Sequence, residues 1–255
     1  MTRRILVIGI GAGDPEHLTV AAVRALNETD VVFLVTKTEA TEEMRAFRLE
    51  LCQRFIEPDR TYRVAEVADP ERDRNAPAYA RSVDDWRGER IARYEQLIAG
   101  LDEHQTGSFL VWGDPSLYDG TILMLDAVLD RGLVTFECEV IPGISSVSAL
   151  AARHRVPLNH VGEAIHIMPG RRLASAGLPA GVENVVVMLD SRQAWRDLDD
   201  DVDIYWGAFL GTPDEVLISG RLAEVRATIE QHRDQARDRK GWMFDTYLLR
   251  RRRTS

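Results

Sequence analysis

Cysteine is scarce in this chain, and long runs of apolar residues are missing. The 2 cysteines, Cys52 and Cys138, lie in segments that resemble a helix and a strand, with no second metal ligand near either in sequence. A disulfide framework and a zinc site are therefore not expected, and we predict two buried free thiols and no metal. The longest apolar runs, such as residues 31–35, are far shorter than the roughly 20 residues that cross a bilayer. The sequence predicts no membrane span.

A surplus of positive charge is also missing, because 41 acidic residues outnumber 32 basic ones and give a net charge of −9. Nucleic acids and anionic membranes bind clustered cations, so this balance disfavours both as partners. A small polyanion can still bind where arginines gather locally. The arginines at 250–253 form one such cluster, but a charged chain end is typical of a solvated tail. The arginines at 3 and 4 precede an apolar run too short for a signal peptide, so we expect a cytoplasmic protein.

The apolar pattern predicts an α/β protein, and 255 residues suffice for two ordinary domains. A buried strand at 4–8, an amphipathic helix at 15–27 and a second strand at 31–35 form a βαβ unit that begins a mostly parallel sheet. We place the domains at residues 1–115 and 116–255.

Later segments are organised differently. The polar stretch 57–90 is typical of an excursion over a surface or a cleft, before a helix at 86–101 and a strand at 108–112. Beyond it, strands outnumber helices, which predicts a mixed sheet with antiparallel pairs in the second domain. The predicted strands there are residues 135–141, 164–168, 184–189, 202–206, 216–219 and 243–249.

A glycine-rich turn, Gly9-Ile10-Gly11-Ala12-Gly13-Asp14-Pro15, follows the first strand. A dinucleotide-binding turn has a third glycine where this chain has Asp14, and an acidic residue at the end of the next strand, which is missing here. A carboxylate at this place would repel a pyrophosphate. The turn therefore disfavours a nicotinamide-dependent oxidoreductase, and it leaves Asp14 as a functional carboxylate or as a simple helix N-cap.

Two further motifs follow predicted strands. Residues 113–120 (GDPSLYDG) repeat the Gly-Asp-Pro sequence, which fits a ligand site at converging strand ends or a plain tight turn. Residues 141–146 (IPGISS) combine a glycine with two hydroxyls. A serine nucleophile would need the G-x-S-x-G pattern, and this segment lacks the glycine after the serine.

Three segments together resemble a known family. They are residues 7–19 (VIGIGAGDPEHLT), 113–118 (GDPSLY) and 142–146 (PGISS). In this order, each at a predicted strand end, they are similar to the tetrapyrrole methylases, which use S-adenosylmethionine. The resemblance implies two α/β domains with the cofactor in the inter-domain cleft, and a homodimer. Segments 151–159, 203–208, 210–215 and 240–249 extend it along the chain and imply methylation of precorrin-5 with release of acetate, in cobalamin biosynthesis.

The resemblance also assigns residues. Expected cofactor contacts are Gly113, Asp114, Pro115, Tyr118, Thr121, Ser145, Ser146, Met188, Gly207 and Ala208. In this family the first motif faces the tetrapyrrole, which implies substrate contacts at Gly11, Gly13 and Asp14. The substrate carries many carboxylates, so we expect arginines in the cleft, drawn from Arg153, Arg155, Arg171, Arg172 and the segment 57–90.

The chemistry that this implies limits the catalytic groups. Methyl transfer from a sulfonium is an in-line displacement that needs orientation, not a metal or a covalent intermediate. Deacetylation requires water to add to an acetyl carbonyl, which calls for a general base. The candidates are Asp14, Asp114, Tyr118, His154 and His17, and the sequence does not choose among them. Methylation of another precorrin carbon, methylation of an RNA ribose and non-catalytic binding remain as alternatives.

Overall fold

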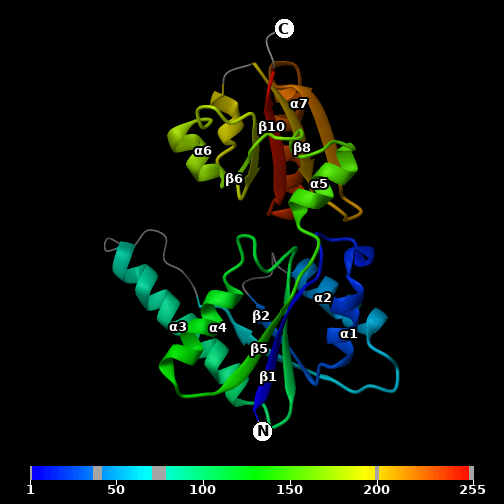
Figure 1. Ribbon diagram of the computed structural model, residues 1–255, viewed down its shortest axis with the longest axis vertical. Helices are drawn as coiled ribbons and strands as arrows, with labels where there is room; N and C mark the ends of the chain where they lie inside the picture. Colours follow the sequence, from blue (N-terminus) through cyan, green and yellow to red (C-terminus); the bar gives the residue numbers. More distant parts are fainter. Residues whose placement is uncertain (1, 37–41, 71–78, 199–200, 253–255) are drawn as a thin grey trace. The chain divides into compact units, whose positions relative to one another are not determined.

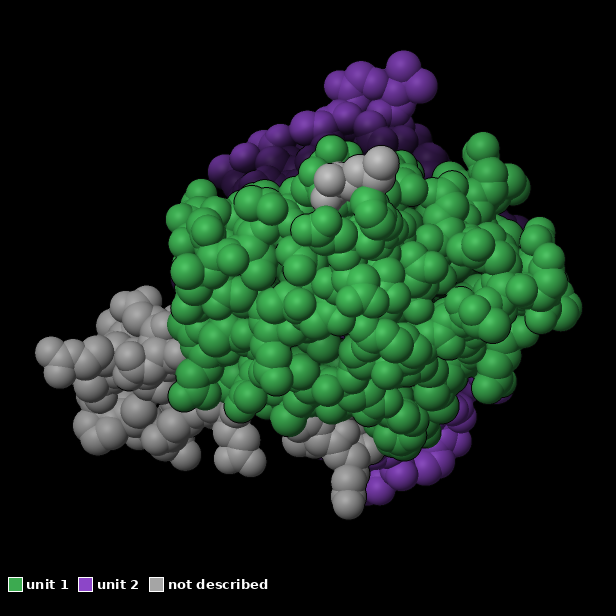
Figure 2. Space-filling view, turned by 90° about the horizontal axis from the view of Figure 1, so that it is seen from below, with its two compact units in different colours: residues 1–11, 15–144 green, residues 12–14, 145–255 purple. Residues whose placement is uncertain are grey.

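The structure is a computed structural model that describes residues 2–36, 42–70, 79–198 and 201–252, apart from the side chains of 79–85. The chain forms two compact units, coloured separately in Figure 2. Unit 1 comprises Met1–Gly11 and Pro15–Ile144, and unit 2 comprises Ala12–Asp14 and Ser145–Ser255. Each unit is an α/β fold built on its own five-stranded sheet.

Unit 1 contains a parallel sheet with strand order β3-β2-β4-β1-β5. Its strands are β1 (Arg3–Gly9), β2 (Val31–Thr36), β3 (Arg63–Ala68), β4 (Thr106–Val111) and β5 (Phe136–Ile141). Its helices are η1 (Pro15–His17), α1 (Val20–Asn27), α2 (Glu42–Phe55), α3 (Tyr79–Ala99) and α4 (Thr121–Arg131).

Alternating side chains of the central strands build two cores, one on each face of this sheet. Leu6 and Ile8 of β1 belong to the core that contains helices α1 and α2. Ile5 and Val7 belong to the core that contains α3 and α4. Figure 1 shows the two helix pairs on opposite faces of the sheet. Because this parallel sheet is covered on both faces, β1 and β4 are buried along most of their length.

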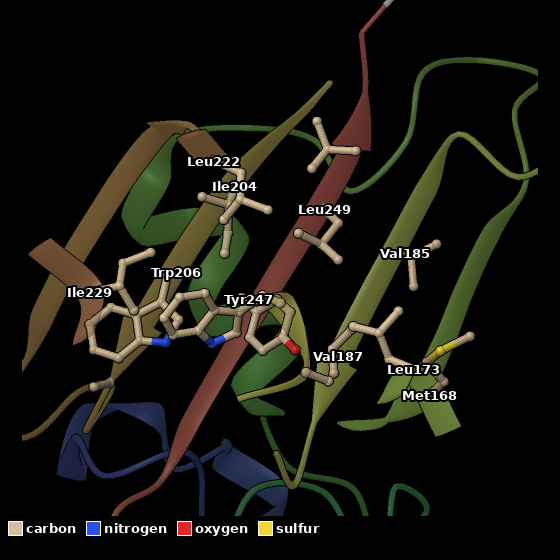
Figure 3. Close-up of a cluster of buried hydrophobic side chains, with 14 of the residues drawn as sticks. Met168, Leu173, Val185, Val187, Ile204, Trp206, Leu222, Ile229, Tyr247 and Leu249 are labelled. Carbon is tan, nitrogen blue, oxygen red and sulfur yellow. The ribbon is translucent and has the colours of Figure 1, made fainter. Parts of the chain in front are cut away.

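Unit 2 contains a mixed sheet with order β6-β7-β10-β8-β9, in which only β6 and β7 run parallel. Its strands are β6 (Ile165–Pro169), β7 (Asn184–Met188), β8 (Val202–Ala208), β9 (Val216–Arg221) and β10 (Asp245–Arg251). Its helices are α5 (Ser146–His154), α6 (Gly170–Ala176), η3 (Ala194–Asp197) and α7 (Leu222–Lys240). Trp206, Tyr247 and Ile229 of its buried core are drawn in Figure 3. The antiparallel pairs expected from the sequence are confirmed.

The boundary between the units differs from the sequence prediction. The chain passes from unit 1 to unit 2 between Ile144 and Ser145, not near residue 115. The reason is that α4 and β5 complete the first sheet, with β5 paired to β1 from Arg3 opposite Phe136 onward. A sequence pattern shows a strand but not the sheet to which it is added.

Three local predictions were wrong in part. The helix expected at 15–27 is a 3-10 turn followed by α1, which begins at Val20 and is capped by Thr19, whose side chain accepts from the Ala22 N–H at 3.0 Å. The segment 57–90 contributes β3 to the sheet and the first half of α3, so it is not only an excursion. Cys138 is exposed, because its strand β5 lies at the edge of the sheet, whereas Cys52 is buried and free as expected.

The arginines near the C-terminus also differ from prediction. Arg250 and Arg251 belong to β10 and are not a solvated tail. The Arg250 Nε donates to Asn184 Oδ1 at 2.9 Å, and the Arg251 backbone N–H donates to the Glu183 carbonyl at 2.9 Å. Arg253 lies outside the described residues. None of the helices in the described part of the chain is long and apolar enough to span a membrane.

Candidate active site

The carboxyl ends of β1 and β4 form the topological switch point of the first sheet. β4 lies between β1 and β2, and the chain leaves β1 toward α1 on one face but leaves β4 toward α4 on the other. Open α/β sheets bind ligands where neighbouring strands diverge in this way. The first motif follows β1 and the second follows β4, so the fold brings together two of the three motifs that the sequence singled out.

Three glycines hold these strand ends in close contact with the third motif. A Cβ atom on Gly143 would overlap the Gly113 carbonyl oxygen and would lie 2.7 Å from the Gly9 carbonyl carbon. A Cβ on Gly9 would lie 2.5 Å from the Gly143 nitrogen. Gly11 and Gly113 also pair as an isolated bridge, with the Gly113 N–H donating to the Gly11 carbonyl at 2.8 Å. Any side chain at Gly9 or Gly143 would force the backbones apart.

Asp114 joins the second motif to the third. Its Oδ2 accepts a hydrogen bond from the Gly143 N–H at 2.9 Å, and its Oδ1 accepts from the Ser116 N–H at 2.9 Å and from the Ser116 hydroxyl. Burial alone would raise the pKa of Asp114, but the hydrogen bonds from Ser116 and Gly143 outweigh it and hold that pKa below its ordinary value. A carboxylate held ionised by three donors is a weak proton acceptor, so the geometry favours a positioning role over that of a general base.

Other residues of the second motif lead into α4. Tyr118 has a φ of 55° and is 43% exposed, so its ring is presented at the surface of unit 1. Asp119 Oδ1 accepts from the Thr121 N–H at 2.7 Å, and Thr121 is buried at the start of the helix. Pro115 is buried beside Gly9. These contacts fix the loop that the resemblance assigns to the cofactor.

The expected cofactor contacts of unit 2 come together around one residue that sequence reasoning did not single out, Thr246. It pairs with Met188 of β7 on one side and with Gly207 of β8 on the other. Its hydroxyl donates to Ser146 Oγ at 3.0 Å. Ser145 caps α5 by accepting from the Ser148 N–H at 3.2 Å. Only the register of three strands could identify Thr246, because the neighbours are far apart in sequence.

Asp14 sits in unit 2 and is not the N-cap of α1. A Cβ on Gly211, whose φ is +76°, would lie 2.8 Å from the Asp14 nitrogen, so the turn at Gly211 packs directly on this backbone. The Asp14 charge also helps to raise the pKa of Arg153, after the larger effect of Glu215. The Arg153 Nε donates to Glu215 Oε1 at 2.6 Å, and Glu215 Oε2 accepts from the Gly211 N–H at 2.9 Å. Asp14, Arg153 and Glu215 are therefore neighbours.

The two candidate histidines have different surroundings. His154 Nε2 lies 3.0 Å from the Trp206 carbonyl oxygen, and its ring meets Tyr205 edge-on. Burial lowers the pKa of His154, so the neutral form prevails at pH 7. His17 ends the 3-10 turn, and a Cβ on Gly11 would overlap its Cβ. Its position indicates packing against the first motif.

The arginines expected to bind the substrate are spread over several elements. Arg155 is exposed and closes α5 with a φ of 55°, and Arg171 and Arg172 are exposed on α6. From the segment 57–90, Arg63 donates to the Gly100 carbonyl at 2.9 Å, and the Arg90 Nε lies 2.9 Å from Asp69 Oδ1. Arg72 and Arg74, with the side chain of Arg81, lie outside the described residues.

A buried polar network includes the residues on either side of Thr246 and the residue before Gly207. Asp245 accepts from the Trp206 Nε1 at 2.9 Å and pairs with Arg233, whose Nη2 donates to the Asp190 carbonyl at 2.9 Å. Tyr247 Oη donates to Asp190 Oδ2 at 2.7 Å. Burial raises the pKa of Asp245 to about 6 despite the opposing effect of Arg233. The network ties β7, β8 and β10 to α7. Among the described residues, no group of three His, Cys, Asp or Glu side chains could hold a metal ion.

Comparison with known families identifies the fold and its motifs. Residues 4–226, which include all three motifs, match the family described as Tetrapyrrole (Corrin/Porphyrin) Methylases. The chain belongs to the tetrapyrrole methylase family. Members of this family use S-adenosylmethionine, and the two α/β units expected from the resemblance are confirmed.

Two relatives of this tetrapyrrole methylase are similar to it over nearly its whole length. A precorrin-6A synthase [deacetylating] from Sinorhizobium sp is 47% identical over 251 residues, which cover 98% of this chain and 95% of the relative. A crystal structure from Corynebacterium diphtheriae, described as a cobalamin synthesis related protein (CobF), is 34% identical with a TM-score of 0.84, covering 98% of this chain and 99% of that one.

A more distant structure shares the fold. Uroporphyrin-III C-methyl transferase from Thermus thermophilus, complexed with S-adenyl homocysteine, has a TM-score of 0.55 and 22% identity, with 96% of each chain covered.

Proposed function

We propose that this tetrapyrrole methylase is a deacetylating precorrin-6A synthase, which transfers a methyl group from S-adenosylmethionine to precorrin-5 and releases acetate in cobalamin biosynthesis. The observation that carries the proposal is the 47% identity with the Sinorhizobium enzyme, which extends over 98% of this chain.

The cofactor is proposed to contact two groups of residues, one in each unit. In unit 1 they are the loop residues Gly113, Asp114, Pro115 and Tyr118 with Thr121. In unit 2 they are Ser145, Ser146, Met188, Gly207 and Ala208. Hydrogen bonds support this assignment, because the Asp114 carboxylate fixes its own loop by accepting from Ser116 and Gly143, and the Thr246 hydroxyl donates to Ser146 of the second group. The sulfonium supplies the methyl group, and these residues orient it for in-line displacement.

Asp14 is proposed as the general base for deacetylation. Asp14 removes a proton from water as the water oxygen adds to the acetyl carbonyl, and the carbon–carbon bond to the macrocycle then breaks, leaving its electron pair on the macrocycle as acetate departs. The choice rests on the position of Asp14 and on arguments against two other candidates, Asp114 and Tyr118. Asp114 is held ionised by its donors, and a neutral phenol such as that of Tyr118 is a poor base near pH 7. Asp14 lies half-buried beside Arg153, at the end of the motif that the resemblance turns toward the tetrapyrrole.

Incubation of the purified protein with precorrin-5 and S-adenosylmethionine tests the proposal. We expect one equivalent of acetate and a product whose mass reflects the gain of a methyl group and the loss of the acetyl group. A methylated product without acetate would instead indicate action on another precorrin carbon. Calorimetry with S-adenosylhomocysteine and with NADH tests the cofactor separately, and binding of NADH alone would overturn the assignment.

The assembly is proposed from family resemblance, and the location and partners are proposed from the sequence pattern and the net charge of −9. We infer a homodimer that works in the cytoplasm without nucleic-acid or membrane partners. Light scattering coupled to size exclusion measures the molar mass, which should be close to twice the 28.8 kDa of one chain. A monomer at micromolar concentration would overturn the dimer but leave the catalytic proposal untouched.

A further inference from the structure

Strands β2 and β4 stop pairing before either strand ends. β2 pairs with β4 only as far as Phe33 opposite Phe109, whereas β1 follows β4 to Val111. The Val111 carbonyl accepts from the Ile10 N–H on the β1 side at 2.9 Å. Successive carbonyls along a strand point to opposite sides, so the Leu110 carbonyl faces the opening between β2 and β4.

The side chain of Arg48 lies in this opening between β2 and β4, which we call the fork. It projects from α2, and its Nε donates to the Leu110 carbonyl at 2.8 Å while its Nη1 donates to the Met44 carbonyl at 3.0 Å. These bonds use two of the five N–H donors of a guanidinium and fix its plane. The side chain is therefore held in place at the carboxyl end of β4, immediately before the Gly113–Tyr118 loop.

The charge of Arg48 lacks a close counter-ion. No carboxylate among the described residues lies within 4.0 Å of it, whereas Arg45 pairs with Glu66 and Arg90 pairs with Asp69. Burial lowers the pKa of Arg48, and the charge of Asp119 acts in the other direction without offsetting it. Asp119 is itself engaged, because its Oδ1 accepts from the Thr121 N–H at 2.7 Å. A half-buried cation without a close counter-ion is stabilised when an anion binds next to it.

We propose that Arg48 binds a carboxylate of the substrate at the fork between β2 and β4. The inference rests on the proposed function, because a polycarboxylate tetrapyrrole supplies the anion. The planar guanidinium, already fixed by two backbone carbonyls, presents its remaining donors in the geometry that suits a carboxylate. Arg48 thereby orients the macrocycle beside the loop that follows β4. Sequence reasoning had no signal for this role, because Arg48 belongs to no motif.

Two variants and one matched control test the role. Arg48→Met removes the charge but keeps an unbranched stem, and Arg48→Lys keeps the charge but not the planar group. Arg45→Met is the control, because Arg45 lies one turn earlier on α2 and is paired with Glu66 on the surface. For each protein, S-adenosylhomocysteine affinity is measured by calorimetry and precorrin-5 turnover by steady-state kinetics. Titration with uroporphyrin, a stable tetrapyrrole carrying carboxylates, measures macrocycle binding directly.

We expect Arg48→Met to raise the KM for precorrin-5 and the uroporphyrin Kd by about 10- to 100-fold, with S-adenosylhomocysteine affinity within about twofold. Arg48→Lys should show a smaller rise, and Arg45→Met none. If Arg48→Met does not fold, Arg48→Lys decides alone. An unchanged KM or an unchanged uroporphyrin Kd in a folded Arg48 variant overturns the inference while leaving the proposed function standing. Failure of the wild-type protein to turn over precorrin-5 overturns the proposed function itself.

Discussion

Asp114 and Gly143, which are separated by α4 and β5 in the chain, are joined by a hydrogen bond of 2.9 Å from the Gly143 N–H to Asp114 Oδ2. The bond connects the loop after β4 to the segment after β5, although β1 lies between these strands in the sheet. It makes the second and third motifs one structural element. The Asp-Pro sequence after β4 therefore has a structural role, in addition to the ligand contact that we propose for it.

The substitution Asp114→Asn tests the contribution of the Asp114–Gly143 hydrogen bond to stability and to cofactor binding. The amide oxygen of the introduced side chain can accept hydrogen bonds, but its amide nitrogen cannot, so one N–H donor loses its partner. We expect the free energy of unfolding to fall by about 1–3 kcal/mol and S-adenosylhomocysteine to bind more weakly. Urea denaturation and calorimetry measure the two effects. Ser116→Ala is the control, since it removes only the hydroxyl donor, and equal losses in both variants would contradict the importance of the Gly143 bond.

Replacement of Asp14 by Asn separates chemistry from structure. As a general base, Asp14 should contribute about 10²–10⁴-fold to turnover, because Asn cannot accept a proton. The structure supplies a matched control, because Thr19 and not Asp14 caps α1. Thr19→Ala should cost about 1 kcal/mol of stability and leave turnover intact. Near-normal acetate release by Asp14→Asn would move the search for the base to His154 and His17.

The Arg233–Asp245 pair predicts a pH dependence of stability. Burial raises the pKa of Asp245 to about 6, above the unfolded value of about 3.9, so the native protein binds the proton more tightly between these limits. Its contribution to stability is complete below about pH 3.9 and is lost as the pH rises through 6.

Compared with Asp245→Asn, the wild-type free energy of unfolding should fall by about 1 kcal/mol between pH 5 and pH 8. Urea denaturation at several pH values measures the difference. Parallel pH profiles for the two proteins would show that Asp245 does not titrate with a raised pKa.

The two cysteines should react differently with a maleimide. Cys138 is exposed on β5, and burial in the core of unit 1 raises the pKa of Cys52 to about 12. Thiolates, not thiols, are the nucleophiles, and burial together with the charges of Asp126 and Glu139 also raises the pKa of Cys138, so at pH 8 the folded protein should take up label slowly and at Cys138 alone. Intact mass spectrometry counts the added groups, and denaturation should expose the second site. Rapid labelling at Cys52 in the native protein would contradict its burial.

Local sequence was enough to predict the α/β class, most strands and the three motifs at strand ends. Apolar runs such as that at β2 and glycine turns such as that before Asp14 are local signals, because they follow from backbone geometry and from burial on both faces of a sheet. The same local signals predicted the mixed sheet of unit 2, where short strands follow one another with few intervening helices.

The packed fold was needed to establish where the units divide, which residues meet and which cations are paired. β5 pairs with β1, and this pairing satisfies backbone N–H and C=O groups of both strands. The residue pattern of β5 does not specify the strand with which it pairs. Thr246 meets Met188, Gly207 and Ser146 through strand register, and Arg48 reaches Leu110 because β2 and β4 separate. Such contacts depend on distances between segments remote in sequence, which are set by packing of the whole unit and not by the local chain.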